Sequence, residues 1–409
     1  MKRLALLFPG QGSQHSGMME EEYRTYPVVR HTFEEASDTL GYDMAELCFS
    51  GGEEQLARSE LTQPALLAVG AASYRLFVQE TGVRPAVAAG HSLGEYTALT
   101  CAGVLKFSDA LGLVRERGRL MMEASASGKG KMLAVSGMSI QTIEEMISRI
   151  ENIKDRPVIA CYNSSRQAVL SGTAESVAAA EELLQSEGAR LSPLKVSGAF
   201  HSPLMAGAAE ELEQLLQSCE LGAFDFPVIS NVEAKPYDLR GENIIRCLKR
   251  QMTEPVHWQQ TMTALLKHSI DAAVEFAPRK TLAGLFRTDY PSVPVYSLED
   301  HAERQTVFSL SFKREYAFSY RYALGQCLAL AASVRNQCLD DQMYREQVIA
   351  PYRKIEHLLL QLEQSDAEPS DDQLRQAWDG LKTIIRAKGA PEDEYRNPLN
   401  VMERMLSRC

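Results

Sequence analysis

The sequence predicts an α/β protein with a large domain on a parallel sheet, a small inserted subdomain and an α-helical C-terminal extension. Two short apolar runs, residues 3–8 and 86–89, are each followed by a glycine-rich turn and then by helix-forming sequence. Such alternation of strand and helix is typical of parallel sheets. The segment 129–197 has a different order of strands and helices, and apolar residues recur at helical spacing after residue 340.

The first strand, residues 3–8, leads into the glycine-rich loop Pro9-Gly10-Gln11-Gly12-Ser13-Gln14. Ligands of α/β sheets bind at the edge formed by the carboxyl ends of the strands. The loop lacks the lysine and the following Ser or Thr of a phosphate-binding loop, but it can supply a backbone N–H group to an anion. Residues 18–80 are predicted to be helical, and Thr62-Gln63-Pro64 is expected to start one helix, because proline suits a first turn.

The second strand ends in Gly90-His91-Ser92-Leu93-Gly94, which has the Gly-X-Ser-X-Gly pattern of a nucleophile elbow. The turn is so tight that only glycine leaves room on either side of the serine, whose oxygen is exposed at the end of the sheet. The following helix directs backbone N–H groups to the same place, where they can stabilise an oxyanion. The pattern favours an α/β-hydrolase-like core; the alternative is an ordinary turn with the serine as a helix cap. His91 is expected to be structural, because neighbours in such a turn point apart.

The segment 129–197 reads as strand, helix, two strands, helix and strand, which is the order of a ferredoxin-like unit. We expect it to be a small subdomain inserted into the larger one. A helix over 203–217 and strands at 227–232 and 272–276 continue the large domain. The predicted organisation is a large subdomain of residues 1–128 and 198–300, the insert of residues 129–197, and a helical extension of residues 301–409.

The extension carries two apolar stripes at helical spacing, one over 344–362 and one over 374–385. Ser370 and Gln373 make a capping box before the second helix, and the Asn-Pro pair at 397–398 is expected to open a last short helix. The stripes indicate helices that pack on the core or on each other. A docking arm for a partner protein is the alternative.

Composition and charge exclude several classes of protein. The chain of 409 residues has 43 basic and 54 acidic side chains, and its net charge of −11 argues against nucleic acid or an anionic membrane as the main partner. No apolar stretch reaches the length of a membrane-spanning segment. The eight cysteines are scattered without a CxxC pair, so neither a metal site nor a disulfide framework is expected, and free thiols fit a reducing cytoplasm.

A serine hydroxyl is a poor nucleophile without a base. Among the eight histidines His201 stands out, because Gly198 precedes it and Ser202-Pro203 follows it at the start of a helix. A turn of this kind can place a side chain at the same edge of the sheet as Ser92. The chain order of serine before histidine also fits α/β hydrolases. The chemistry alone does not exclude the other seven histidines as the base for Ser92.

Four motifs follow one another along the first 300 residues. They are Gly-Gln-Gly-Ser-Gln at 10–14, Gly-His-Ser-Leu-Gly-Glu-Tyr at 90–96, Gly-Ala-Phe-His-Ser at 198–202, and Gln251 followed by Pro-Val-His-Trp at 255–258. In this order and spacing they resemble the motifs of malonyl-CoA:acyl carrier protein transacylases. That family includes the stand-alone acyltransferases that serve polyketide synthases.

The resemblance implies a role for each matching residue. Ser92 would carry the acyl group as an ester, and His201 would act as its base and then as the acid for the leaving thiol. The histidine would be oriented by the backbone carbonyl of Gln251 instead of by a carboxylate. The backbone N–H groups of Gln11 and Leu93 would form the oxyanion hole.

The resemblance also implies which residues bind the substrate. Arg117 would bind the free carboxylate of malonate, since a guanidinium stays charged and offers two parallel donors. The alternative for Arg117 is a surface position, as expected for the other arginines of its helix. Gln63 would line the pocket, and Asn163 would lie near it on the small subdomain. Phe200 would crowd an α-methyl group and so favour malonyl over methylmalonyl, by about 1–3 kcal/mol for one methyl group.

Two features depart from the family pattern. Ala277-Pro278-Arg279 stands where the family usually has Gly-Pro-Gly. Because both glycines are missing, the resemblance does not predict the backbone conformation of this segment. An alternative role for Arg279 and Lys280 is contact with a phosphate or an acidic carrier. Residues 301–409 lie outside the resemblance.

The resemblance implies an acyltransferase that moves malonyl from malonyl-CoA to the phosphopantetheine thiol of an acyl carrier protein. No tightly bound cofactor is expected. The extension favours polyketide over fatty acid biosynthesis, and other synthase subunits are candidate partners for it. One alternative is an acyl hydrolase that clears stalled acyl groups from carrier proteins, against which Arg117 argues. The other is a non-catalytic scaffold that binds carriers.

Overall fold

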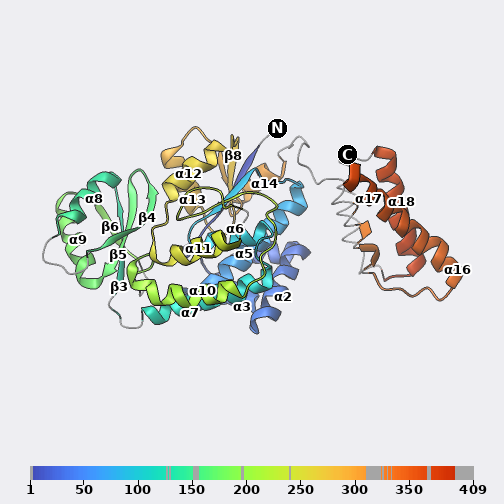
Figure 1. Ribbon diagram of the computed structural model, residues 1–409, viewed down its shortest axis with the longest axis horizontal. Coiled ribbons are helices and arrows are strands. Elements are labelled where there is room, and N and C mark those ends of the chain that lie inside the picture. The colour runs from blue at the N-terminus through green and yellow to red at the C-terminus, as the bar shows by residue number, and fades with distance from the viewer. Residues whose placement is uncertain are drawn as a thin grey trace. The chain divides into compact units, whose positions relative to one another are not determined.

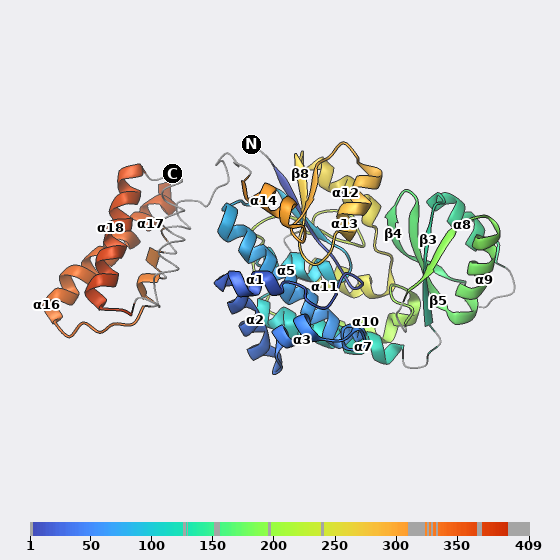
Figure 2. The same ribbon diagram turned by 180° about the vertical axis from the view of Figure 1, so that it is seen from behind.

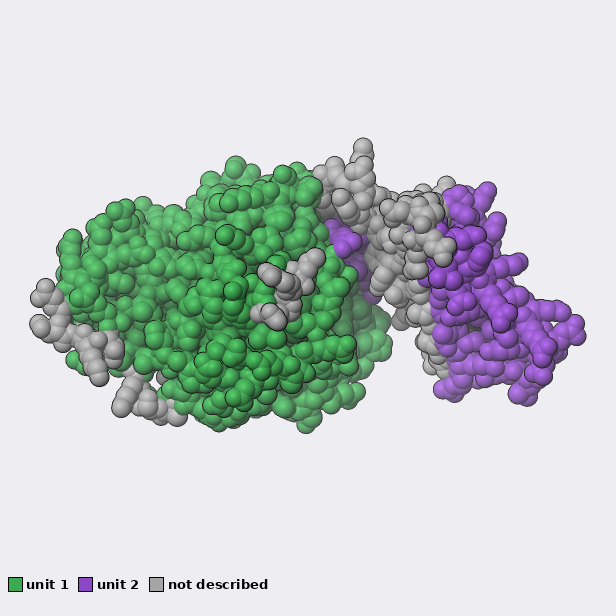
Figure 3. Space-filling model, viewed as in Figure 1, with its two compact units in different colours: residues 1–77, 85–311 green, residues 78–84, 312–409 purple. Residues whose placement is uncertain are grey.

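The computed structural model describes residues 3–125, 128, 130–150, 156–194, 198–238, 241–309, 324, 327, 328, 330–332, 334–365 and 370–391. The chain forms two compact units, which Figure 3 shows in different colours. One consists of residues 1–77 and 85–311, and the other of residues 78–84 and 312–409.

The centre of the first unit is a five-stranded parallel sheet with the order β7-β2-β1-β8-β9. The strands are β1 (Leu4–Phe8), β2 (Val87–Gly90), β7 (Val228–Ile229), β8 (Ala272–Glu275) and β9 (Val295–Ser297). Helices cover both faces of the sheet (Figures 1 and 2), so its strands are almost completely buried. The predicted α/β class is confirmed. β7 is shorter than the expected strand over 227–232, because the chain turns after Ile229 and Ser230 N–H donates to Lys235 O.

Helix α5 (Ser59–Thr81) begins earlier than the sequence predicts. Arg58 O already accepts the N–H groups of Leu61 and Thr62, so the helix is formed before Pro64. Outside the inserted segment, the described helices of this unit also include α1 (Glu20–Thr25), α2 (Pro27–Leu40), α3 (Met44–Ser50), α4 (Glu53–Ala57), α6 (Leu93–Cys101), α7 (Phe107–Ala124), the 3-10 turn η1 (Pro203–Met205), α10 (Ala206–Gln217), α11 (Gly241–Thr253), α12 (Trp258–Lys267), α13 (Thr281–Asp289) and α14 (His301–Ser309).

The inserted segment forms a four-stranded antiparallel sheet with the order β4-β5-β3-β6. Its elements are β3 (Gly130–Ser136), α8 (Ile140–Ser148), β4 (Val158–Ser164), β5 (Gln167–Thr173), α9 (Ala174–Ser186) and β6 (Arg190–Pro193). This is the predicted ferredoxin-like order, and both helices pack on one face of the sheet (Figure 1). Backbone hydrogen bonds attach the insert to the large subdomain, because Val256 N–H donates to Ala160 O and Val256 O accepts from Tyr162 N–H.

Helix α14 belongs to the first unit. Arg304 on this helix is buried; it donates to a carboxylate oxygen of Glu22 and, over 3.1 Å, to Leu298 O. The unit therefore continues to residue 311, past the expected end of the large subdomain at residue 300.

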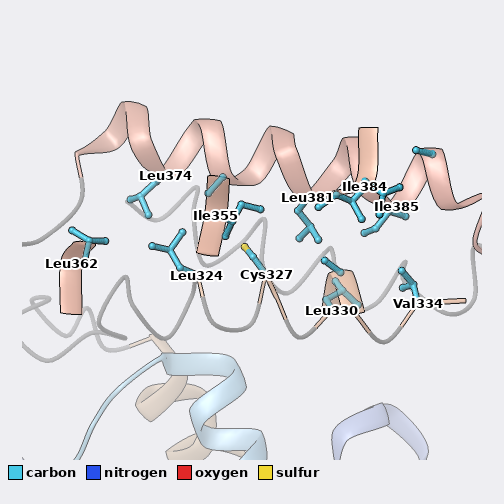
Figure 4. Packing of buried hydrophobic residues seen from close by; sticks show 14 residues of the cluster. Leu324, Cys327, Leu330, Val334, Ile355, Leu362, Leu374, Leu381, Ile384 and Ile385 are labelled. Atoms are coloured by element: carbon cyan, nitrogen blue, oxygen red, sulfur yellow. The ribbon is translucent and has the colours of Figure 1, made fainter. Parts of the chain in front are cut away.

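The second unit is a helical bundle with an apolar core of its own (Figure 4). Its described elements include α16 (Asp341–Tyr344), the π-helical turn η2 (Arg345–Ile349), α17 (Ala350–Ser365) and α18 (Asp371–Lys388). α17 and α18 pack on each other, with Ile355 against Gly380. This is the expected arrangement in which the two apolar stripes pack helix against helix. Ser370 and Gln373 form the predicted capping box. The expected helix start at 397–398 lies outside the described residues.

The seven cysteines in the described part of the chain are all free. None of the helices described there is both long and apolar enough to cross a membrane. Within the same residues, no three His, Cys, Asp or Glu side chains are grouped so that they could hold a metal ion.

Candidate active site

Ser92 lies in a strained turn between β2 and α6. Its φ of 51° and ψ of −105° are unusual for a residue with a side chain, and such strain is concentrated at functional sites. A Cβ atom on Gly90 would lie 1.9 Å from the backbone of Gly94, and one on Gly94 would lie 2.0 Å from Phe8 O. The turn therefore requires glycine at both positions, and it places Ser92 at the carboxyl end of the parallel sheet.

His201 contacts Ser92 directly. Its Nε2 lies 2.8 Å from Ser92 Oγ, and its Nδ1–H donates over 2.6 Å to the backbone oxygen of Gln251. The second bond fixes the neutral ring with its lone pair on Nε2, so Nε2 can accept the serine proton. Burial, and then the positive charge of Arg117, lower the pKa of His201 to about 3. The ring is therefore neutral near pH 7 and is competent as a base.

Arg117 is 1% exposed and lies beside the same serine. One Nη donates to Gln63 Oε1 over 2.8 Å, and the other donates to Gln251 Oε1 over 2.9 Å and to Ser92 Oγ over 3.2 Å. The guanidinium also lies over the ring of Tyr96, 5.2 Å from its centroid. These hydrogen-bond partners are all neutral, and among the described residues the Nε of Arg117 has no hydrogen-bond partner. Its charge is thus available to an anion that enters the site.

The position of Arg117 depends on a close approach of two helices. A Cβ atom on Gly118 of α7 would lie 2.4 Å from Ser59 O, at the start of α5. This contact brings Gln63 of α5 next to Arg117. Another arginine of α7, Arg119, is instead 44% exposed and pairs with acidic neighbours on its own helix.

Three residues of the site, Glu95, Asn231 and Tyr237, could not be predicted from the sequence. Glu95 is buried; its Oε1 accepts from Asn231 N–H over 2.9 Å and from the Tyr237 hydroxyl over 2.6 Å. Asn231 Oδ1 accepts from Ser92 N–H over 2.7 Å, which supports the strained turn. Burial raises the pKa of Glu95 to about 7, against the hydrogen bonds that lower it. Glu95 lies within the serine motif of residues 90–96, but no local pattern signals Asn231 or Tyr237.

The glycine-rich loop lies against the elbow. A Cβ atom on Gly10 would be 2.3 Å from His91 O, so the backbone of the loop touches the turn. The Gln11 side chain donates to Ser59 Oγ over 3.1 Å. Among the described residues, neither the Gln11 nor the Leu93 backbone N–H donates a hydrogen bond within the protein. Both groups are available to an oxyanion, and their role in such a hole stays a prediction.

Two other predicted site residues have contacts that position the site. Asn163 Oδ1 lies 2.9 Å from Nε2 of His91, whose ring is 5.5 Å from that of Trp258. Burial lowers the pKa of His91, and its contacts fit the structural role expected for it. Phe200 is buried beside His201, where a Cβ atom on Gly198 would lie 2.6 Å from its ring. The structure thus brings Asn163 to the elbow through His91 and leaves the effect of Phe200 on substrate choice as a prediction.

The loop that departs from the family pattern is held by intramolecular contacts. Arg279 has a φ of 67°, and its Nε–H donates to Ser13 O over 3.1 Å. Lys280 pairs with Asp300 over 2.5 Å. Both side chains therefore have partners within the protein, and they attach this loop to the glycine-rich loop and to the segment before α14.

The site places a strained serine at the carboxyl edge of a parallel sheet, with a neutral histidine on the serine oxygen and available backbone N–H donors beside it. This arrangement is that of a serine enzyme that handles acyl groups. The chain belongs to the family described as "Acyl transferase domain", which it matches over residues 5–310.

Similar proteins narrow this class. A malonyl CoA-acyl carrier protein transacylase from Bacillus subtilis is 34% identical over 393 residues, which cover 96% of this chain and 98% of that protein. The solved malonyl CoA-acyl carrier protein transacylase from Coxiella burnetii has a TM-score of 0.72 and 36% identity, over 75% of this chain and 97% of that one. A malonyl-transacylase solved in complex with its type II PKS acyl-carrier protein has a TM-score of 0.71 and 38% identity, over 75% of this chain and 99% of that one.

Proposed function

We propose that the protein transfers malonyl from malonyl-CoA to the phosphopantetheine thiol of an acyl carrier protein, in polyketide or fatty acid biosynthesis. The observation that carries this proposal is the buried guanidinium of Arg117, whose hydrogen-bond partners are neutral and which lies 3.2 Å from Ser92 Oγ. A charged donor beside a nucleophile fits an acyl group that carries a second, free carboxylate. The names of the similar proteins support the same substrate and partner.

In the first half-reaction the Ser92 hydroxyl attacks the thioester carbonyl of malonyl-CoA. His201 Nε2 takes the hydroxyl proton as the new C–O bond forms, and the backbone N–H groups of Gln11 and Leu93 stabilise the oxyanion. The C–S bond then breaks, and His201 returns the proton to the leaving thiolate of coenzyme A. The malonyl group is left as an ester on Ser92.

In the second half-reaction the phosphopantetheine thiol of the carrier replaces coenzyme A. His201 takes the thiol proton, the sulfur attacks the ester carbonyl, and the C–O bond to Ser92 breaks as His201 protonates the serine oxygen. Transfer requires that the thiol reacts faster than water, because water would release free malonate.

Arg117 distinguishes malonyl from a plain acyl group. The carboxylate of malonate replaces the Ser92 hydroxyl as its partner and forms charge-assisted hydrogen bonds of about 1.5–3 kcal/mol each. An acetyl group leaves the buried charge without a counter-ion. Phe200 and Gln63 complete the acyl pocket, and Phe200 restricts substituents on the α-carbon.

The helical bundle of the second unit is proposed to bind other synthase subunits. The Bacillus subtilis relative covers 96% of this chain, so it includes most of the bundle, whereas the two solved relatives cover 75%. An assembly role agrees with a bundle that has its own core. The reducing, cytoplasmic compartment expected from the cysteines also stays a prediction.

The test is to incubate the protein with labelled malonyl-CoA, denature it and read intact and peptide masses. We expect a malonyl ester on Ser92, its absence in Ser92→Ala, and movement of the label to a carrier protein with a phosphopantetheine thiol. Absence of the ester in the wild type would contradict the proposal. Fast release of acetyl or longer acyl groups to water, without transfer of malonyl, would instead identify an acyl hydrolase.

A further inference from the structure

The side chain of Gln251 contacts three parts of the active site, in addition to the contact of its backbone oxygen with His201. It is completely buried near the end of α11. Its Nε2 donates to the backbone oxygen of Ser92 over 2.9 Å and to Glu95 Oε2 over 2.5 Å. Its Oε1 accepts from Arg117 Nη2 over 2.9 Å. One amide therefore connects the elbow, a buried carboxylate and the guanidinium.

The carboxylate decides which end of this amide faces Arg117. A carboxamide can lie in two orientations that differ by exchange of its oxygen and nitrogen. The Ser92 backbone oxygen is an acceptor only, and so is Glu95 when it is ionised, above its pKa of about 7; both then select the NH₂ end of Gln251. The oxygen end is left facing Arg117, which has only donors. In the opposite orientation the NH₂ group of Gln251 would face the guanidinium of Arg117. The oxygen of Gln251 would then face the Glu95 carboxyl group and the Ser92 backbone oxygen.

Glu95 is itself held in one place by two donors from the chain beyond β7. Asn231 N–H and the Tyr237 hydroxyl both donate to its Oε1, which leaves Oε2 for Gln251. Gln251 lies between Glu95 and Arg117, so the negative charge that Glu95 carries when it is ionised does not pair directly with the guanidinium. The donors of Arg117 therefore stay available to the carboxylate of a substrate.

We propose that Glu95, through the side-chain amide of Gln251, is a positioning residue that orients Arg117 and so determines the preference for acyl groups with a free carboxylate. This inference rests on the proposed malonyl transfer and adds to it a second layer of residues that do not touch the substrate.

The main test is Glu95→Gln, which keeps the shape of the side chain. The new amide accepts from Asn231 and Tyr237 through its oxygen and presents an NH₂ group to Gln251. Gln251 then turns its oxygen to residue 95 and its NH₂ group to Arg117, which is displaced. We expect the ratio of kcat/KM for malonyl-CoA to that for acetyl-CoA to fall about 10- to 100-fold, as for the loss of one hydrogen bond to a charged group. The loss is expected mainly in KM for malonyl-CoA.

A matched control variant and a double variant that exchanges residues 95 and 251 test whether Glu95 acts by positioning Arg117. Glu233→Gln removes a carboxylate that pairs with Arg246 and Arg250 at the surface, and it should leave the ratio unchanged. The double variant Glu95→Gln with Gln251→Glu exchanges the amide and the carboxylate between the two positions, and the Ser92 backbone oxygen loses its side-chain donor. The malonyl preference should not recover, because the carboxylate at 251 now pairs directly with Arg117.

Each outcome either supports the inference or contradicts it. An unchanged ratio in Glu95→Gln, or recovery of the ratio in the double variant, would overturn it while leaving the malonyl ester of the wild type intact. If the wild type forms no malonyl ester, the proposed function itself has failed. If Glu95→Gln does not fold, Glu95→Asp is measured instead, because it keeps the carboxyl group but withdraws it from Gln251 by one methylene; a ratio equal to that of the wild type in this variant would also overturn the inference.

Discussion

Arg117 is buried, always charged and surrounded by neutral acceptors. Its partners are the amide oxygens of Gln63 and Gln251 and the hydroxyl of Ser92. Neutral oxygens satisfy the donors without cancelling the charge, and burial removes the water that would otherwise screen it. A carboxylate that enters with the substrate is therefore strongly attracted to this point.

Replacement of Arg117 by alanine should remove the preference for malonyl. We expect kcat/KM for malonyl-CoA to fall about 100-fold or more, because charge-assisted hydrogen bonds to the carboxylate are lost. Acetyl-CoA should react at least as well as before, since no buried charge is left without a partner. Ester formation on Ser92 with both thioesters measures the effect.

The control is Arg119→Ala on the same helix, where the side chain is 44% exposed and pairs with Glu116 and Glu123. Both thioesters should react with this variant as they do with the wild type. Equal malonyl preference in Arg117→Ala and Arg119→Ala would disprove the role of Arg117.

The pH dependence of acylation should report the environment of His201. Its pKa of about 3 keeps the ring neutral well below pH 6.5, the ordinary pKa of histidine, so acylation by acetyl-CoA should not lose its base near that pH. Arg117→Ala removes a nearby positive charge that lowers this pKa. The acid limb of the rate profile in that variant should move to higher pH, and an unmoved limb would contradict the proposed coupling.

At the scale of elements, the contact between Arg117 and Gln63 depends on how closely α7 approaches α5. Gly118 faces the backbone of Ser59, and the same contact places Gln63 beside Arg117. A single methyl group at this crossing must push the two helices apart, because the atom it meets belongs to the backbone.

Gly118→Ala should therefore destabilise the protein by about 1–3 kcal/mol and raise KM for malonyl-CoA. Gly112→Ala on the same helix is the matched control, because its Cβ atom would meet nothing within 4 Å. That variant should gain up to about 1 kcal/mol in stability, as expected for alanine in a helix. Thermal unfolding and thioester kinetics on both variants measure the difference, and equal effects would disprove the close approach.

At the scale of the molecule, α14 ends the first unit. Its Arg304 is buried against Glu22 and Leu298, so this helix completes the first unit. The helical bundle of the second unit is held by its own apolar side chains, which include Leu381 and Ile384 (Figure 4).

Two truncations test this boundary. The chain 1–311 should fold and should transfer malonyl to an isolated carrier protein at close to the wild-type rate. The chain 1–300 should be less stable by about 3 kcal/mol or more, because Glu22 loses its buried partner. Unfolding curves and transfer rates measure both, and equal stability of the two truncations would show that α14 is dispensable. Loss of transfer by 1–311 would show that the bundle acts in catalysis instead of assembly.

Features that depend on neighbouring residues could be predicted from the sequence. The α/β class, the ferredoxin-like order of the insert and the capping box at Ser370 each follow from local periodicity or from pairs a few residues apart. The start of α5 could not be placed correctly, because the hydrogen bonds to Arg58 O outweigh the preference of Pro64 for a first turn. The first compact unit extends past residue 300 because Arg304 is buried by a partner 282 residues away, and no local pattern signals such a contact.

The sequence alone determined that this protein has a serine elbow, one outstanding histidine and an arginine-bearing helix, because these are patterns of adjacent residues. The resemblance had already pointed to Arg117, but only the tertiary structure decided that Glu95, Asn231 and Tyr237 support the site. Those contacts join residues 136 to 142 positions apart, and no local propensity specifies such distances. The physical reason is that burial and charge are set by packing, and packing brings together segments that the order of the chain keeps apart.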